Sequence, residues 1–364
     1  MSSTWGKNIQ LSIFGESHGP EIGVVISGFP AGLIINMDEL HHHLSRRAPG
    51  QSAFSTPRKE ADKPILKSGV HNGKTTGAPI CICFQNTDTK SQHYSDMSSL
   101  MRPGHSDYPA YVKYKGFHDI RGGGHFSGRL TAPMVVAGSL CRQFLQRQGI
   151  EIAAHISSIA GISDCPLDPV SPDRALLKAL RQKTFAVIDD EKGEEMQAAI
   201  LAAKQDLNSV GGTVECVASG VPAGIGSPMF RNVESVVSSF LFAIPAVKGV
   251  SFGSGFSCAE MTGSACNDTY YIEGGVKTHT NHCGGILGGI TNGMPLVLHT
   301  AFKPTPTIGT PQQTIDVHTM QEGILVGKGR HDPCIVPRAV VVVESALAVC
   351  LMDLWMDDFP ESNR

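Results

Sequence analysis

Short apolar runs separated by irregular, glycine-rich stretches make up most of the chain, and few segments keep a regular period. The runs at 22–26, 79–84 and 214–217 are rich in apolar and β-branched residues and are bounded by turn residues, so they predict strands. Apolar residues at helical spacing predict a helix over 135–145 and two more within 173–203.

Two further helices and one loop region complete this pattern. Asp38 is expected to cap a helix that runs to Arg47, and a last helix is expected after Glu344. Segment 101–129 has no sustained period and predicts long functional loops. Helices and strands that do not alternate strictly favour an α+β fold with a large antiparallel or mixed sheet over a doubly wound fold.

One hexapeptide pattern occurs twice. Ser-Gly-x-Pro-Ala-Gly stands at 27–32 and again at 219–224, and a hydrophobic, strand-like run precedes both copies. The matched context indicates an internally duplicated β-α-β unit. No low-complexity linker divides the chain, so we expect a single domain over residues 1–364.

The composition narrows the class of protein. Glycine and proline supply 40 and 22 of the 364 residues, without the three-residue period of collagen. Hydrophobic residues make up 41% of the chain, which is enough for a sizeable core and excludes global disorder. The formal net charge is −3, so the chain lacks the overall basic character of a nucleic-acid-binding protein.

The cysteines and the termini indicate a cytoplasmic protein. The ten cysteines form no CxxC pair and are expected to be reduced thiols. Residues 1–14 lack the pattern of a secretory signal. The longest apolar stretch, 339–356, is interrupted by Glu344 and Asp353, so no membrane span is predicted.

Four regions place reactive side chains within glycine-rich, irregular sequence: residues 15–19, residues 102–107 with 121–129, residues 279–289 with 303–307, and residues 328–338. In the first region, Ser17 and His18 lie between glycines and present a hydroxyl, an imidazole and backbone N–H groups suited to an anion. The arginines of the second and fourth regions offer guanidinium forks for carboxylate or phosphate. Taken singly, each region is also consistent with an exposed turn or a flexible charged loop.

Competing motifs fail on inspection. Residues 253–255 lack the third glycine of a dinucleotide fingerprint, and residues 323–329 lack the spacing and the hydroxyl residue of a phosphate loop. His279, His282 and the triple histidine 41–43 have no second spaced ligand pair, so no metal site is predicted. The triple histidine is expected to be a solvated helix face.

Taken together, these regions closely resemble the chorismate synthase family. The motifs that carry the resemblance occur in family order from residue 7 to about residue 355: residues 15–30, 46–50, 102–107, 124–131, 281–285, 303–305 and 330–345. Several independent motifs in the same order argue against a chance match.

The resemblance implies a fold, an activity and a cofactor. The fold would be a single-domain β-α-β sandwich assembled as a homotetramer. The activity would be that of a carbon–oxygen lyase, converting 5-enolpyruvylshikimate 3-phosphate to chorismate by trans-1,4-elimination of phosphate. Members require reduced FMN although the reaction has no net redox change. Some relatives reduce their flavin with NADPH, but this chain shows no nicotinamide fingerprint, so we expect a flavin reductase or another external source of reduced FMN.

The resemblance also assigns roles to residues. His18 would protonate the leaving phosphate, His105 would lie beside the reduced flavin, and Asp332 would act with flavin N5 in removing the C6 proton. The implied FMN-binding residues are His125, Phe126, Ser127, Ala246, Gly288, Lys303, Pro304, Thr305, Pro306, Thr307 and Arg330. The implied substrate-binding residues are Ser17, Arg46, Arg47, Arg102, Arg129 and Arg338.

The chain departs from the usual family pattern at Ala48, where a third arginine is common, and at His125 and Phe126, which replace Arg and Ser. Ser27 and Pro245 are further departures. Two other functions remain open: a phosphate- or flavin-binding protein without turnover, and a flavin oxidoreductase that performs net hydride transfer.

Overall fold

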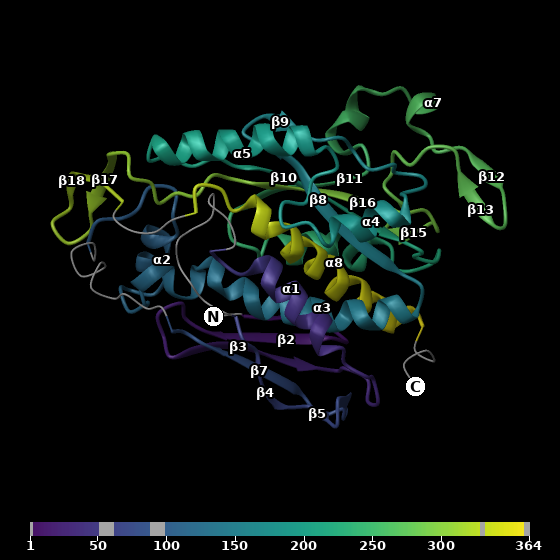
Figure 1. Cartoon of the computed structure of the whole chain (residues 1–364), viewed down its shortest axis with the longest axis horizontal. Coiled ribbons are helices and arrows are strands. Elements are labelled where there is room, and N and C mark those ends of the chain that lie inside the picture. The colour runs from purple at the N-terminus through teal and green to yellow at the C-terminus, as the bar shows by residue number, and fades with distance from the viewer. Residues whose placement is uncertain (1–2, 51–61, 88–98, 328–331, 360–364) are drawn as a thin grey trace.

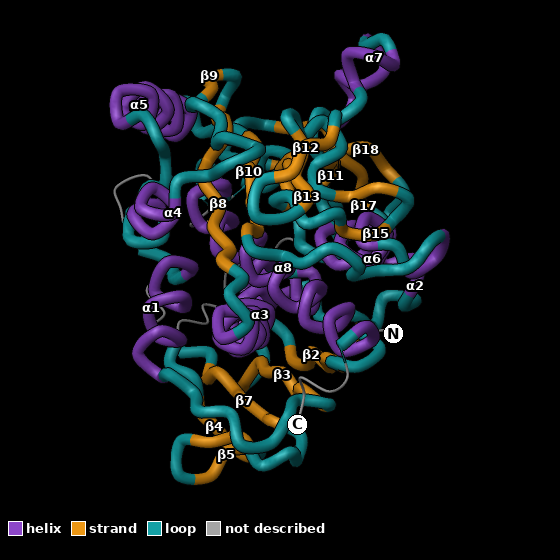
Figure 2. The backbone as a smooth tube through the Cα atoms, turned by 90° about the vertical axis from the view of Figure 1, so that its right-hand side faces the viewer, coloured by secondary structure: helices purple, strands orange, loops and turns teal. Residues whose placement is uncertain are grey.

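Two antiparallel sheets enclose a layer of helices in the computed structural model, which describes residues 3–50, 62–87, 99–327 and 332–359 (Figure 1, Figure 2). The first sheet has the order β1-β2-β3-β7-β4, with strands Thr4–Trp5, Gln10–Gly15, Glu21–Ser27, Ile80–Gln85 and Ile65–Ser68. The second has the order β11-β16-β10-β8-β9, with strands Val247–Phe252, Leu296–Phe302, Gly212–Ser219, Glu151–Ile159 and Ile162–Ser163. This arrangement confirms the β-α-β sandwich.

The helices between the sheets are α1 (Met37–Arg47), α3 (Thr131–Arg147), α6 (Val233–Leu241) and α8 (Val336–Asp358). α3 packs along α8 at the centre of the molecule, and their side chains join those of both sheets in one large hydrophobic cluster. At Gly138 of α3, a Cβ would overlap the Cα and Cβ of Ser345 in α8. The two helices therefore touch through their backbones at this point.

The remaining elements lie outside this sandwich. α4 (Arg174–Leu180) and α5 (Asp190–Gln205) cover the outer face of the second sheet (Figure 1). Short hairpins and helices extend from the edges: β5 (Val70–His71), β6 (Lys74–Thr75), α2 (Asp107–Lys113), α7 (Gly263–Cys266), β12 (Tyr270–Ile272), β13 (Val276–Thr278), β14 (Ile286–Leu287), β15 (Ile290–Thr291), β17 (Gln312–Asp316) and β18 (Gln321–Leu325).

The two halves of the sandwich repeat one topology. The central strands of the first sheet are ordered β2-β3-β7-β4 and those of the second β8-β10-β16-β11, and in each half the chain visits them in the same sequence. A helix follows the second strand of each half (α1 and α6), and a long central helix follows the last one (α3 and α8).

The repeated hexapeptide has the same structure in both halves. The Thr75 hydroxyl donates to Pro30 O at 2.6 Å and accepts the N–H of Leu33 at 2.9 Å. Thr291 makes the same two bonds in the second half, to the proline of the repeat at 2.7 Å and from the residue after the repeat at 2.9 Å. The predicted internal duplication therefore extends to individual hydrogen bonds.

Several element boundaries differ from the sequence-based expectation. α1 is capped by Asn36, whose side chain accepts the N–H groups of Asp38 and Glu39, so Asp38 lies inside the first turn, where the helix dipole favours an acidic residue. Within the predicted loop 101–129, residues 107–113 form α2. α8 begins at Val336, so the final helix starts before Glu344 and not after it.

The triple histidine is a solvated face only in part: His41 is exposed, His42 is half-buried and His43 is buried. His43 is only 2% exposed, and its Nδ1 contacts the Ser139 hydroxyl at 2.9 Å, while Nε2 of His42 contacts Arg181 O at 3.0 Å. α1 packs this side against α3, which explains the difference.

Among the described residues, α8 is long and apolar enough to cross a membrane, but 94% of its most apolar window is buried within the fold. Its two internal carboxylates are also satisfied by protein groups. Glu344 pairs with Arg46, and Asp353 accepts three successive backbone N–H groups from residues 7–9 at 2.6–3.0 Å. The apolar composition of α8 is thus explained by its place in the core.

Candidate active site

A cavity of about 600 Å³ lies where the N-terminal ends of α3 and α8 meet the glycine-rich segment 121–126. This volume is within the usual range for small-molecule sites. Its wall also includes the end of α1, the segment 102–106, the start of β11 and the residues after β16. Among the described residues that line it, six are lysines or arginines and one is an acid, Asp332. The cationic residues are Arg47, Arg102, Arg129, Lys248, Lys303 and Arg338.

Two helix N-termini add to this positive character. Thr131, the first residue of α3, lines the cavity, and so does Ile335, which immediately precedes α8. The N-terminus of a helix carries a partial positive charge and backbone N–H groups without helical partners. An anion in this cavity is therefore favoured by backbone dipoles as well as by side chains.

Arg47 and Arg129 are held by one buried carboxylate, Asp62. Arg47 Nη1 donates to Asp62 Oδ2 at 2.6 Å, and Arg129 Nη1 donates to Oδ1. Burial alone raises the pKa of Asp62, but the two arginines outweigh this effect and hold the pKa below its usual value. Arg47 also donates from Nε to Thr131 Oγ1 at 3.0 Å, so its fork has a fixed orientation.

Asp107 performs a similar role for Arg102 and His105. It accepts Arg102 Nε at 2.6 Å and Nη2 at 2.7 Å, and it contacts His105 Nδ1 at 2.6 Å. Burial raises the pKa of Asp107, but hydrogen bonds from His105 and Arg102 outweigh this effect and hold the pKa well below its usual value. The carboxylate is therefore ionised at neutral pH. An ionised carboxylate is a pure acceptor, so His105 carries a proton on Nδ1 and directs Nε2 away from Asp107.

The other wall combines Asp332, Arg338, Lys303 and Thr305. Arg338 Nη1 donates to Asp332 Oδ2, and Lys303 Nζ donates to Gly104 O. The Thr305 hydroxyl oxygen is buried and has no hydrogen-bond partner among the described residues. Because buried hydroxyl groups are normally satisfied, Thr305 is suited to a polar group of a bound ligand.

Ser17 and His18 lie directly behind the glycine-rich segment. The Ser17 hydroxyl contacts His18 Nδ1 at 3.1 Å and is also within hydrogen-bond distance of the carbonyls of Arg121 and Gly122. Gly122 lines the cavity with a φ of +58°, and a Cβ there would overlap the His18 ring. Glycine at this position therefore allows His18 to approach the cavity.

The structure brings most of the sequence-predicted site residues to this cavity. The lining includes Arg47, Arg102, His105, His125, Phe126, Ser127, Arg129, Ala246, Lys303, Thr305, Pro306, Thr307, Asp332 and Arg338. Ser17, His18, Arg46, Gly288 and Pro304 are not in the lining. Gly288 lies in the turn between β14 and β15, and Arg330 lies outside the described residues.

Arg46 has a different environment from the other predicted substrate-binding arginines. It forms a bidentate ion pair with Glu344, at 2.6 and 3.0 Å, and the two side chains are 8% and 2% exposed. Its fork is therefore occupied by a carboxylate of the protein.

Asp62, Asp107 and Thr131 orient the cavity side chains but were not among the predicted site residues. Asp107 had a local signal, since it follows His105 by two residues within a motif that was singled out. Thr131 also had one, since it ends the motif 124–131. Asp62 had none, because its contacts with Arg47 and Arg129 form between separate segments of the chain.

The chain is similar to known proteins along nearly its whole length. Residues 9–356 match the family model described as chorismate synthase. The chain is 46% identical over 349 residues to a chorismate synthase of Thermococcus gammatolerans and 43% identical over 355 residues to one of Dehalococcoides mccartyi. The alignments cover 96% and 97% of this chain, respectively, and 96% of each relative. A crystal structure of chorismate synthase superposes with a TM-score of 0.76 at 29% identity, covering 99% of this chain and 96% of that one.

Proposed function

The chain belongs to the chorismate synthase family and is a lyase, and from that premise we propose that it eliminates phosphate from 5-enolpyruvylshikimate 3-phosphate to give chorismate. The observation that carries the proposal is the cavity, whose described lining combines six cationic side chains with His105 and Asp332. A substrate with one phosphate and two carboxylates needs several cationic contacts, and guanidinium groups bind both kinds of anion in bidentate fashion.

The same cavity fits a flavin mononucleotide. The Thr305 hydroxyl, which has no partner in the described part of the chain, and the ammonium of Lys303 suit its polar groups. Phe242, Ile244 and Ala246 provide an apolar wall for a flat ring. Reduced FMN, when bound, supplies electron density that assists loss of the leaving group and is then recovered. We propose that an external reductase or another reductant provides the reduced cofactor.

The side chains at the cavity fall into two groups, those that bind the anionic groups of the substrate and those that transfer protons. Arg47, Arg102, Arg129 and Arg338 bind and orient the anionic groups, and their carboxylate partners keep the forks in fixed positions. His18, behind Gly122, holds a proton for the departing phosphate. His105 holds a proton at Nδ1 against Asp107, and Asp332 accepts the substrate proton.

We further propose that the chain is a single domain, acts in the cytoplasm and assembles as a homotetramer. The support for one domain is the large hydrophobic cluster that includes side chains from both sheets and from the helices between them. The ten cysteines are free thiols, as a reducing compartment requires.

An anaerobic assay with dithionite-reduced FMN tests the activity. We expect stoichiometric release of phosphate from the enolpyruvyl substrate with no net oxidation of the flavin. Net flavin oxidation coupled to substrate reduction would indicate an oxidoreductase, and binding of both ligands without phosphate release would indicate a protein without turnover. Either result would contradict the proposal.

The proposed proton-transfer residues are tested by substitution. His18→Ala, His105→Ala and Asp332→Ala are each expected to lower kcat by roughly 10²–10⁴-fold, the usual contribution of general acid–base groups. Circular dichroism should show an unchanged fold. Full activity in any one variant would remove that residue from the mechanism.

A further inference from the structure

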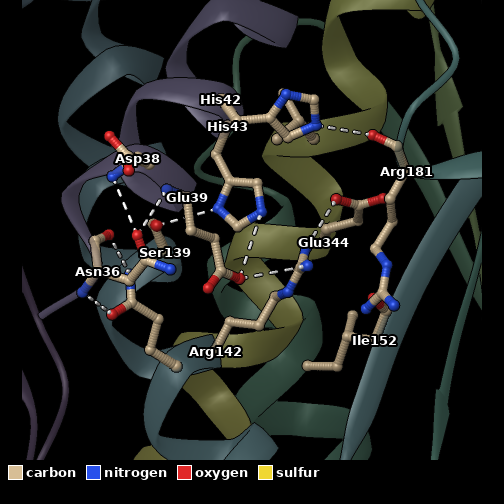
Figure 3. A network of polar contacts seen from close by, with 12 residues as sticks. Asn36, Asp38, Glu39, His42, His43, Ser139, Arg142, Ile152, Arg181 and Glu344 are labelled. Atoms are coloured by element: carbon tan, nitrogen blue, oxygen red, sulfur yellow. Dashed lines mark hydrogen bonds and ion pairs between the residues drawn. The ribbon is translucent and has the colours of Figure 1, made fainter. Parts of the chain in front are cut away.

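The buried pair formed by Arg46 and Glu344 lies beside the cavity but outside its lining. Glu344 of α8 accepts hydrogen bonds from Nη1 and Nη2 of Arg46, at the end of α1, and from the Ala154 N–H of β8 at 3.0 Å. Its Oε2 also lies 3.6 Å from Nη1 of Arg142 in α3. Figure 3 shows Glu344 and Arg142 facing one another between the helices. One carboxylate thus joins three helices and a strand.

The carboxylate is charged within this environment. Burial raises the pKa of Glu344, but Arg46 and Arg142 lower it below its usual value. A buried ion pair of this kind adds little net stability, because desolvation offsets the attraction. The presence of this ion pair next to a binding site is better explained by the fixed position that it gives to the end of α1 against α8.

Arg46 is bonded directly to the cavity residue Arg47, so the position of one constrains the other. Arg46 and Arg47 are the last two residues of α1, and the N–H of Ala48 closes that turn on Leu44 and Ser45. Fixing the side chain of Arg46 on α8 therefore fixes the direction in which Arg47 leaves the helix. Arg47 extends from this turn to Asp62 and Thr131 in the cavity wall.

The same turn also orients a second cavity arginine. The Arg47 carbonyl accepts the Arg338 Nε–H at 2.9 Å, and Arg338 in turn pairs with Asp332. A shift of the last turn of α1 would therefore move both guanidinium groups, and with Arg338 it would disturb the ion pair to Asp332.

We propose that Arg46 and Glu344 are positioning residues that hold Arg47 and Arg338 in their binding orientation, and that Arg46 does not itself contact the substrate. This inference rests on the proposed function in naming the substrate. A misplacement of about 1 Å in an oriented site can cost about 10²-fold in rate or binding, so the pair is expected to be measurable in substrate affinity.

Three variants test the inference in the full-length protein with reduced FMN. Arg46→Met and Glu344→Gln are each expected to raise KM about 10-fold or more with little change in kcat, the pattern of lost uniform binding. Arg46→Lys keeps the charge and is expected to recover part of the affinity. The double variant Arg46→Met/Glu344→Gln should resemble either single variant, because both act through one contact.

Glu344→Gln separates positioning from direct contact. If Arg46 bound the substrate itself, releasing it from Glu344 would lower KM or leave it unchanged. If the pair positions Arg47, the same substitution raises KM. A lower or unchanged KM in Glu344→Gln would therefore overturn the inference.

Arg142→Met is the matched control. Arg142 is also buried and also faces Glu344, but it lies three turns along α3 from the cavity residue Thr131. We expect Arg142→Met to lower the thermal midpoint as Arg46→Met does while leaving KM unchanged. Equal increases in KM for both variants would show a general structural effect and contradict positioning.

Binding of inorganic phosphate, measured by calorimetry, separates this inference from the proposed function. If the wild-type protein shows no turnover, the proposed function fails, but phosphate affinity still reports the arginine geometry. In that assay Arg46→Met and Glu344→Gln should weaken phosphate binding about 10-fold and Arg142→Met should not. Unchanged phosphate affinity in all three variants would contradict the inference alone.

Discussion

Each cavity arginine is paired with a carboxylate of the protein before any ligand arrives. Asp62 serves Arg47 and Arg129, Asp107 serves Arg102, and Asp332 serves Arg338. These acids orient the forks and reduce the repulsion between guanidinium groups that lie close together. As a consequence, a ligand anion binds to a guanidinium group whose charge is already partly neutralised by a carboxylate of the protein, so the attraction is weaker than for an unpaired arginine. The paired arginines therefore contribute to ligand binding more through their fixed orientation than through their total charge.

Asp107 gives this view a direct test, because it contacts both Arg102 and His105. Asp107→Asn replaces a charged acceptor with an amide, which no longer enforces the proton on His105 Nδ1. We expect kcat to fall about 10-fold or more, measured in the anaerobic phosphate-release assay.

Asp316→Asn is the control for Asp107→Asn. Asp316 is also an acid with a lowered pKa, about 2, held mainly by a hydrogen bond from Ser99, but it does not line the cavity. Its substitution should leave kcat unchanged. A matching fall in both variants would indicate a loss of folding and not a loss of orientation.

At the scale of helices and strands, local sequence patterns predicted some elements correctly and missed or misplaced others. Strands at 22–26, 79–84 and 214–217 and the duplicated hexapeptide were predicted because periodicity and turn residues act locally, and all are confirmed. The start of α8 was misplaced, because Glu344 appeared to interrupt an apolar run and its partner Arg46 is 298 residues away. α2 was missed, because a seven-residue helix shows too few turns for a period to emerge.

The duplicated turn predicts equal effects in the two halves. Thr75→Val and Thr291→Val each leave a half-buried proline carbonyl and a backbone N–H without their hydroxyl partner. Each substitution is expected to cost about 1–3 kcal/mol, the usual cost of an unsatisfied buried group. Chemical denaturation measures both, and we expect the two values to agree closely.

Clearly unequal costs would show that the two turns are alike only in geometry. Thr75 and Thr291 themselves are equally buried, at 4% and 3% exposed. Their N–H donors differ, because the Leu33 N–H is half-buried and the Ile225 N–H is buried, so a modestly larger cost at Thr291 would reflect this difference.

At the scale of the whole molecule, the site lies at the junction of the two halves. α3 ends the first half and α8 ends the second, and both present their N-termini to the same cavity. Recognisable motifs in the sequence pointed to most of the predicted site residues that line this cavity. They did not identify Asp62 and Thr131 as orienting partners, because these contacts depend on how α1, α3 and the segment near residue 62 pack together.

The packing of α3 on α8 is tested at Gly138. Alanine normally favours a helix over glycine by about 1 kcal/mol, but a Cβ at this position would overlap the backbone of Ser345. We therefore expect Gly138→Ala to destabilise the protein by about 1–3 kcal/mol, as overpacked cores do. Thermal unfolding measures the sign directly.

Gly263→Ala is the matched helical control, because nothing lies within 4 Å of a Cβ added there. Its effect is expected to stay within about 0.5 kcal/mol. A stabilising Gly138→Ala would mean that the two helices separate more readily than their contact suggests.

The matched halves carry an implication for the symmetry of the site. Each half has one sheet and one long apolar helix, and the two long helices pack along one another. One half on its own would expose that face to water, so it would be stable only as a pair of identical copies. Because both halves belong to one chain, equivalent positions can differ: the segment before α3 carries glycines 122–124, while the segment before α8 carries Asp332. A symmetric pair could not have placed one acid against one glycine-rich wall; a fused chain can.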